Sequence, residues 1–283
     1  MKHTAGWLEP PSRWKRRKNR VTKTLVTYQL DGEIALIGIN RPEKRNALSA
    51  ETANQIILAA ERAGQEAKAG VIFGHGEHFS AGLDLVAIGA QRRNGITDDQ
   101  KRLRHEGHQG FDAISRGAIP FVAALRGAVI GYGLELAASA QIRVADRTAY
   151  FALPEAMRGI FVGGGGSVRI QRLLGYARMA DMMLTRRVLL ADEAHVQNLC
   201  QYLVEPGEAL EKAKALARTI TENVALSNWT ICNILPRMAD LSHDDGFMLE
   251  QMAAHYTFGA ESQARLDQFA SKTAPRLRKE GER

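Results

Sequence analysis

The chain has 283 residues, of which 45% are apolar and 24% charged, so it resembles an ordinary globular protein of one large or two small domains. It contains no run near the roughly 18 apolar residues that cross a bilayer, and no secretory-type apolar start, so no membrane partner is expected. Its two cysteines, Cys200 and Cys232, cannot form a disulfide framework, which favours a reducing compartment and a cytoplasmic location.

The net charge of +7 lies entirely in the first 24 residues, which hold eight basic groups and one acid. Residues 25–283 balance at 30 basic and 30 acidic groups. The run from Arg13 to Arg20 could bind a polyanion by releasing counterions, and a transit peptide is a further alternative. We expect instead a solvated, disordered leader, because runs of like charge usually are one. Nucleic acid is therefore not the expected partner.

Regular structure is expected from about Leu25. Residues 33–40 form an apolar run rich in strand formers that stops at Pro42, so they predict a strand. Ser49 is a plausible N-cap for an amphipathic helix over about 50–68. The apolar residues at helical spacing are Ala53, Ile56, Ile57, Ala60 and Ala63. A second buried strand, residues 71–73, follows.

The same alternation continues along the chain, and strands that alternate with helices predict parallel units with right-handed crossovers. The expected strands are 120–126 and 142–146, and the expected helices are 96–115, 133–140, 166–179, one beginning near Asp192, 208–222 and 245–270. The last two form a helical end without strands.

Three glycine-containing segments carry the candidate chemistry: residues 79–85, 126–136 and 151–166. Glycines before a helix let the backbone approach a ligand, and the first helical turn leaves amide donors for an oxygen that gathers negative charge. Two such turns can supply the two donors of an oxyanion hole. Glu135 and Glu155 lie beside these turns, and a pair of carboxyl groups can take and deliver the protons of one water.

Each feature also has a purely structural interpretation. Glycine-rich strand-to-helix turns are common, and no Gly-Lys-Ser/Thr follows, so phosphate binding of the P-loop type is disfavoured. A lone glutamate in a first helical turn is usually a surface residue. Glu135, however, has Leu134, Leu136 and Ala137 around it, and a carboxylate in apolar surroundings needs a partner or a purpose.

The order of these segments resembles the crotonase (enoyl-CoA hydratase/isomerase) superfamily over about residues 25–275. The run 40–49, Asn-Arg-Pro-Glu-Lys-Arg-Asn-Ala-Leu-Ser, is similar to the opening motif of that family. The resemblance implies an α/β fold, a spiral of repeated ββα units, with a C-terminal helical region. It divides the chain into a basic tail (1–24), a spiral core (25–205) and a helical, oligomerising region (206–283).

The resemblance also implies roles for particular residues. The amides of Leu83 and Tyr132 would form the oxyanion hole, and Glu135 and Glu155 match the two glutamates that hydratases use. Residues that would bind coenzyme A or substrate are Lys44, Arg45, Ala47, Ala81, Gly82, Asp84, Leu85, Gly131, Pro154, Phe269 and Lys272. No metal and no separate cofactor is expected, since coenzyme A is part of the substrate.

The sequence departs from the family pattern at several places. Tyr132 interrupts a glycine triplet and puts a large ring beside the expected oxyanion hole, where it can reshape the acyl site. The usual Cys-Asp after the helix is Ala140-Gln141, and the C-terminal motif is blurred around Phe269. Residues 86–110 are polar, which indicates either a solvated face or a site for a carboxylated acyl group. Their basic residues are Arg92, Arg93, Arg102, Arg104, His105 and His108.

The resulting prediction is an enoyl-CoA hydratase that adds water across a 2-enoyl thioester, a hydro-lyase, as a homotrimer or hexamer. The alternatives are an isomerase working through Glu155 alone, another crotonase-type lyase or hydrolase, an RNA-binding homologue using the basic tail, and a non-catalytic scaffold. Both glutamates are retained, which argues against the scaffold.

Overall fold

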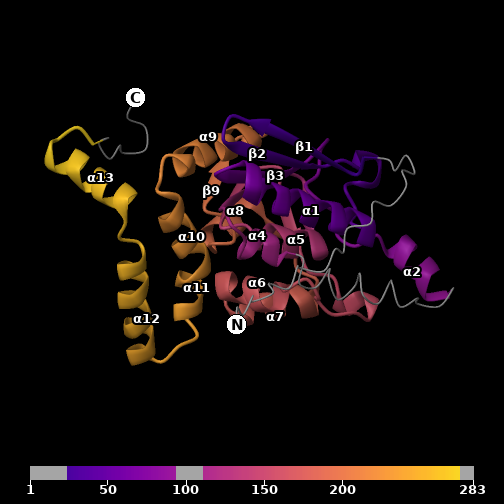
Figure 1. Ribbon diagram of the computed structural model, residues 1–283. Helices are drawn as coiled ribbons and strands as arrows, with labels where there is room; N and C mark the ends of the chain where they lie inside the picture. The colour runs from indigo at the N-terminus through magenta and orange to yellow at the C-terminus, as the bar shows by residue number, and fades with distance from the viewer. Residues whose placement is uncertain (1–23, 94–110, 275–283) are drawn as a thin grey trace, which may run out of the picture.

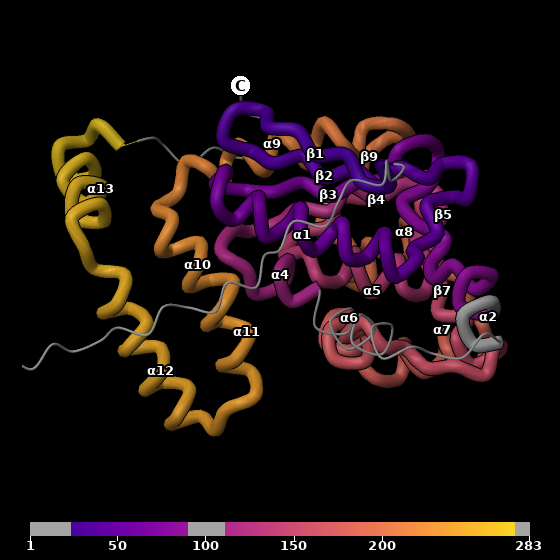
Figure 2. Tube along the Cα trace, turned by 45° about the vertical axis from the view of Figure 1, so that its right-hand side comes forward, coloured from indigo at the N-terminus to yellow at the C-terminus, as the bar shows by residue number. Residues whose placement is uncertain are grey.

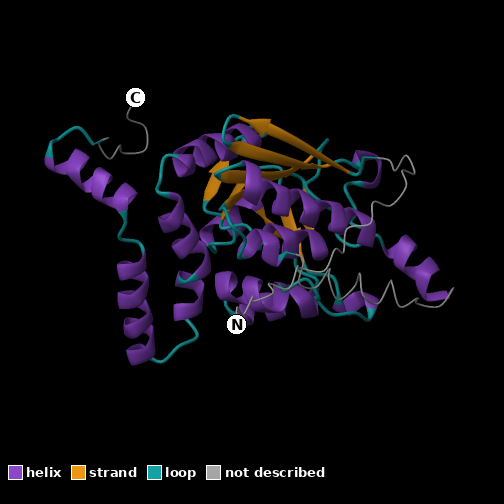
Figure 3. Ribbon diagram, viewed as in Figure 1, coloured by secondary structure: helices purple, strands orange, loops and turns teal. Residues whose placement is uncertain are grey.

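The structure, a computed structural model, describes residues 24–93 and 111–274. In this part of the chain the larger sheet has six strands and lies between helices (Figures 1 and 3). β1 (Val26–Asp31) pairs antiparallel with β2 (Ile34–Ile39), and every further pairing in this sheet is parallel. The order continues through β3 (Ala69–Gly74), β4 (Phe121–Leu125), β6 (Ile142–Asp146) and β9 (Tyr202–Val204).

A smaller sheet gives the fold its spiral character. β5 (Ala128–Ile130) follows β4, and β7 (Tyr150–Ala152) follows β6, so the chain passes twice from the larger sheet to the smaller one. Each passage ends in helices: α5 (Tyr132–Ala137) after β5, and α6 (Gly166–Leu174) after β7. β8 (Leu189–Leu190) closes this sheet antiparallel to β7. The expected ββα spiral is confirmed.

The larger sheet is buried on both faces, as a parallel sheet covered by helices must be. Alternate residues of β3 enter different cores: Ile72 faces the main core and Val71 the smaller one. The smaller core is covered by α9 (Ala209–Thr221), whose Ala213 and Ala217 are fully buried and let the helix approach the strands closely. This packing covers the second face of the larger sheet.

α1 (Ala50–Glu66) confirms the expected helix. The Ser49 hydroxyl accepts a hydrogen bond from the Thr52 amide at 3.1 Å, which caps the first turn. Of the expected apolar face, Ile56 is fully buried, whereas Ile57 is only partly buried. Helix amphipathicity thus placed this element correctly.

Two expected helices are interrupted. The segment 166–179 breaks at Gly175 (φ +79°), which separates α6 from α7 (Tyr176–Thr185). The segment 245–270 breaks before Gly259, giving α12 (His243–Tyr256) and α13 (Ala260–Ala270). Of the helix expected at 96–115, only α4 (Asp112–Ser115) belongs to the described residues. The remaining helical segments are η1 (Pro42–Lys44), α2 (Leu85–Arg93), η2 (Ala156–Arg158), α8 (Ala191–Val196), α10 (Ala225–Asn233) and α11 (Leu235–Met238).

The C-terminal helices stand apart from the sheets. In two views turned by 45°, α12 and α13 form an arm beside α10 and α11 (Figures 1 and 2). None of the residues of α12 or α13 is buried. The arm therefore contributes no core of its own within one chain.

Candidate active site

The two glutamates lie at the same edge of the smaller sheet. β5 and β7 are parallel neighbours, with Ile130 opposite Ala152, so their carboxyl ends meet. Glu135 lies in the first turn of α5 after β5, and Glu155 follows β7 directly after Pro154 and begins the turn into η2. Ligands of α/β folds bind outside such carboxyl ends. The topology thus brings together two residues twenty positions apart.

Gly131 makes this approach possible. Its φ of +54° favours glycine, and a Cβ there would lie 2.6 Å from Oε1 of Glu155. The Gly131 carbonyl accepts the first helical hydrogen bond of α5, from the Glu135 amide at 2.9 Å. The Glu155 carboxyl group therefore lies against the start of the helix that carries Glu135.

Glu135 is 2% exposed and is bound by the backbone of a glycine loop. Its Oε2 accepts hydrogen bonds from the amides of Gly164 at 2.6 Å and Gly166 at 2.8 Å, and Oε1 accepts one from Gly163 at 3.3 Å. Burial raises the pKa of Glu135, and these three amides together with the positive charge of Arg169 oppose that rise. The amides stabilise the ionised carboxylate.

The carboxyl group of Glu155 has different surroundings from that of Glu135. Glu155 is 6% exposed, and its buried Oε2 has no hydrogen-bond partner among the described residues. Burial raises the pKa of Glu155 to about 7; its own backbone hydrogen bond opposes the rise, and the negative charge of Glu135 adds to it. A buried oxygen without a partner marks a place where a water or a substrate would bind. Glu155 is therefore the group that can exchange a proton near neutral pH.

The two expected oxyanion segments touch each other. The Gly82 carbonyl accepts a hydrogen bond from the Leu48 amide at 2.7 Å, and the Asp84 amide donates to the Leu48 carbonyl at 2.9 Å. Leu48 and Leu83 thus form a parallel bridge, in which Leu48 bonds to the residues on either side of Leu83. The Leu83 amide therefore points away from Leu48, and it has no acceptor among the described residues. A Cβ on Gly82 would lie 3.6 Å from the amide nitrogen of Tyr132, at the start of α5. The two amides thus come from segments in contact.

The loop after β2 is fixed to the first of these segments. Arg41 and Asp84 are both nearly buried and form a 2.8 Å ion pair, and the Arg41 guanidinium also donates to the Ala47 carbonyl. The Ala81 amide donates to the Arg45 carbonyl at 2.9 Å, and Lys44 Nζ lies 3.8 Å from Asp84 Oδ2. The structure therefore brings the expected coenzyme A residues 44–47 beside residues 81–84, and Leu85, more than a third exposed, follows at the start of α2.

Other expected residues lie elsewhere. Phe269 is 76% exposed on α13, and Lys272 follows this helix. Figures 1 and 2 both show α13 well separated from α5, so a single chain does not bring these two residues to the glutamates. The basic side chains expected to shape the acyl site, from Arg92 to His108, lie outside the side chains that the structure describes.

Three features of the site were not predicted. Arg169 of α6 donates to the Gly164 carbonyl, and its Nη1 lies 3.6 Å from Oδ1 of Asp112. Arg41 joins the two loops, and the glycine-loop amides hold Glu135. The run of four glycines was visible in the sequence, but nothing local indicated that its amides bind a glutamate 28 to 31 residues away.

Two features are absent from the described residues. Among them, no cluster of three or more His, Cys, Asp or Glu side chains is arranged to hold a metal ion. No helix in residues 24–93 or 111–274 is long and apolar enough to cross a membrane.

The spiral of ββα units and the paired carboxyl groups define an enzyme of the crotonase type, and comparisons with known proteins agree. The sequence model of the enoyl-CoA hydratase/isomerase family matches residues 29–280. A proposed enoyl-CoA hydratase from Rhodopseudomonas palustris, known from a crystal structure, has 41% sequence identity to this chain. The two structures match with a TM-score of 0.79, covering 88% of this chain and 95% of that one.

Two curated relatives are similar over most of their length. Enoyl-CoA hydratase EchA19 of Mycobacterium tuberculosis is 30% identical over 250 residues, covering 86% of this chain and 92% of the relative. Short-chain-enoyl-CoA hydratase of Clostridium acetobutylicum is 29% identical over 241 residues, covering 84% and 91%. The chain therefore belongs to the enoyl-CoA hydratase/isomerase family, whose members act on acyl-CoA thioesters.

Proposed function

We propose that the protein hydrates the double bond of a 2-enoyl-CoA, with Glu135 as the base and Glu155 as the acid. The different surroundings of these two neighbouring carboxyl groups carry the proposal. Three amides favour an ionised Glu135, whereas Glu155 has an unpartnered buried oxygen and a pKa raised to about 7. Neighbouring carboxyl groups whose surroundings separate their proton affinities are suited to acid and base roles.

In the proposed reaction the amides of Leu83 and Tyr132 donate to the thioester carbonyl oxygen. Glu135 takes a proton from a water while the water oxygen bonds to the β-carbon, and the displaced electrons collect on the carbonyl oxygen as an enolate. Glu155 gives its proton to the α-carbon, which restores the carbonyl. Water has then been added, and the proton on Glu135 returns to Glu155 directly or through solvent, so the two act as a coupled pair.

For the coenzyme A moiety we propose the surface formed by residues 44–47 and 81–85, with Gly131 and Pro154 beside the acyl group. No separate cofactor enters this scheme. Asp84 takes an indirect part, because its carboxylate is bound to Arg41. It holds the two loops together rather than contacting the substrate.

Incubation with crotonyl-CoA tests the proposal. We expect loss of the conjugated thioester absorbance, a hydroxyacyl product by mass, and a decrease in rate of about 10²–10⁴ in Glu135→Gln. Glu208→Gln, an exposed glutamate far along the chain, serves as a control. No hydration, with interconversion of 3-enoyl- and 2-enoyl-CoA that survives Glu135→Gln, would replace hydration by the isomerase alternative.

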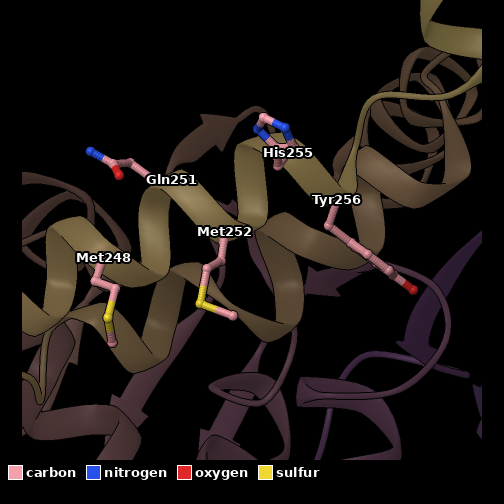
Figure 4. A pocket seen from close by; sticks show the side chains of 5 residues that line it. All are labelled: Met248, Gln251, Met252, His255 and Tyr256. Atoms are coloured by element: carbon pink, nitrogen blue, oxygen red, sulfur yellow. The ribbon is translucent and has the colours of Figure 1, made fainter.

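We also propose that residues 206–283 join copies of the chain into trimers or hexamers. An open hollow of about 570 Å³ lies along α12, where Figure 4 shows Met248, Met252 and Tyr256 pointing to one side of the helix. These three side chains are each more than half exposed. Apolar surface of this kind marks an association site, and isolated helices of this length are marginal in water. Light scattering of the purified chain would give the mass of the assembly, and a monomer would refute the proposal.

A further inference from the structure

The ring of Tyr132 occupies a defined position beside the paired glutamates. It packs against the fully buried ring of Phe111, with 4.8 Å between the ring centroids and 37° between the planes. On another side it lies on the backbone of Gly164, where a Cβ would be only 2.6 Å from Cε2 of the tyrosine. The lack of a side chain at Gly164 therefore leaves the space that the ring fills.

This position links the ring to Glu135. The amide of Gly164, the residue against which the ring packs, donates to Oε2 of Glu135 at 2.6 Å. Burial raises the pKa of the Tyr132 phenol, and the negative charge of Glu135 raises it further, so the phenol stays neutral at physiological pH. Phe111, Tyr132 and Gly164 thus pack together on the Glu135 side of the site.

The proposed chemistry fixes where the acyl chain must begin. The thioester carbonyl lies at the amides of Leu83 and Tyr132, and the β-carbon lies within reach of Glu135 and Glu155. The ring belongs to the residue whose amide would bind the carbonyl, and it packs against Gly164, whose own amide holds Glu135. It is therefore placed to limit the space available beyond the β-carbon.

We propose that Tyr132, supported by Phe111, ends the space for the acyl chain and makes the protein selective for short acyl-CoA thioesters. This inference rests on the proposed function for the position of the thioester. Its two parts are separable, because the backbone amide of residue 132 serves the carbonyl while the ring sets the length. A substitution can therefore remove the ring and keep the amide.

Binding of saturated acyl-CoAs tests the inference without any turnover. Calorimetry with butyryl-CoA and octanoyl-CoA gives the ratio of their dissociation constants within one protein, so a loss of stability in a variant does not enter the ratio. The wild type should prefer butyryl-CoA. Tyr132→Ala should shift the ratio toward octanoyl-CoA by about 10–200-fold, the range that small changes of apolar fit produce. Tyr132→Phe keeps the ring and should keep the wild-type ratio.

A ratio unchanged in Tyr132→Ala would overturn the inference, as would a wild type that binds octanoyl-CoA more tightly than butyryl-CoA. If the alanine variant does not fold, Tyr132→Leu removes the far half of the ring while still covering Gly164, and it should shift the ratio in the same direction. Failure of hydration with crotonyl-CoA, together with a ring-dependent binding ratio, would reject the reaction and retain the length selection. Hydration of crotonyl-CoA together with a binding ratio that does not depend on the ring would retain the reaction and reject the length selection.

Discussion

Replacing Glu155 with glutamine should change how the stability of the protein depends on pH. The pKa of Glu155 is raised from 4.5 to about 7 in the folded protein, chiefly by burial. Because the folded-state value is the higher one, the stabilising form is the protonated one. Its contribution is complete below about pH 4.5 and is lost as the pH rises through about 7. A shift of this size corresponds to about 3 kcal/mol of unfolding free energy.

Glutamine resembles the protonated acid and cannot ionise, so Glu155→Gln should not show this loss. Urea unfolding followed by circular dichroism at about pH 5 and about pH 8 measures it, with the protein concentration held fixed because association contributes to stability. The variant should gain up to about 3 kcal/mol over the wild type between the two pH values. Glu208→Gln, at an exposed position, should follow the wild type. Equal pH dependence in wild type and Glu155→Gln would refute the assignment of Glu155 as a buried, neutral acid.

Three further substitutions probe other parts of the molecule. Asp84→Asn leaves the buried charge of Arg41 without its partner and should lower the unfolding free energy by about 3–5 kcal/mol; an unchanged urea midpoint would contradict this. Arg169→Met removes a positive charge that lowers the pKa of Glu135, so the acid limb of the pH profile of kcat/KM should move to higher pH, and a fixed limb would argue against it. Met252→Glu puts a charge on the apolar side of α12 and should lower the mass measured by light scattering without a change in circular dichroism.

Sequence patterns located those elements whose signals are local. The Ser49 cap and the apolar spacing of α1 lie within one stretch of chain, and the apolar run of β2 ends at a proline. The strand β7 was not predicted, because it has three residues and becomes a strand only by pairing with β5, about 22 positions earlier in the chain. Gly175 ends a helix whose composition would otherwise continue into α7.

In the candidate site, too, local sequence signals identified some residues, whereas long-range contacts were not predicted. The apolar neighbours of Glu135 were enough to single it out, and the family resemblance supplied its relation to Glu155. The contacts that set the properties of these groups are long-range. The amides on Glu135 come from 28 to 31 residues further along the chain, and Arg41 meets Asp84 across 43 residues. Such pairings depend on how the strands are arranged, which no local pattern contains.

The run Gly163–Gly166 looks in the sequence like a flexible, uninformative stretch, yet Gly164, Gly165 and Gly166 each exclude a side chain for a different reason. A side chain on Gly164 would collide with the Tyr132 ring, and one on Gly166 would lie 2.6 Å from Cγ of Glu135. Gly165 has a φ of +88° and faces the guanidinium of Arg169. Each glycine is therefore constrained by a different partner: Gly164 by Tyr132, Gly165 by Arg169 and Gly166 by Glu135. A smaller residue in place of Tyr132 would allow a side chain at Gly164, while Gly165 and Gly166 would stay constrained.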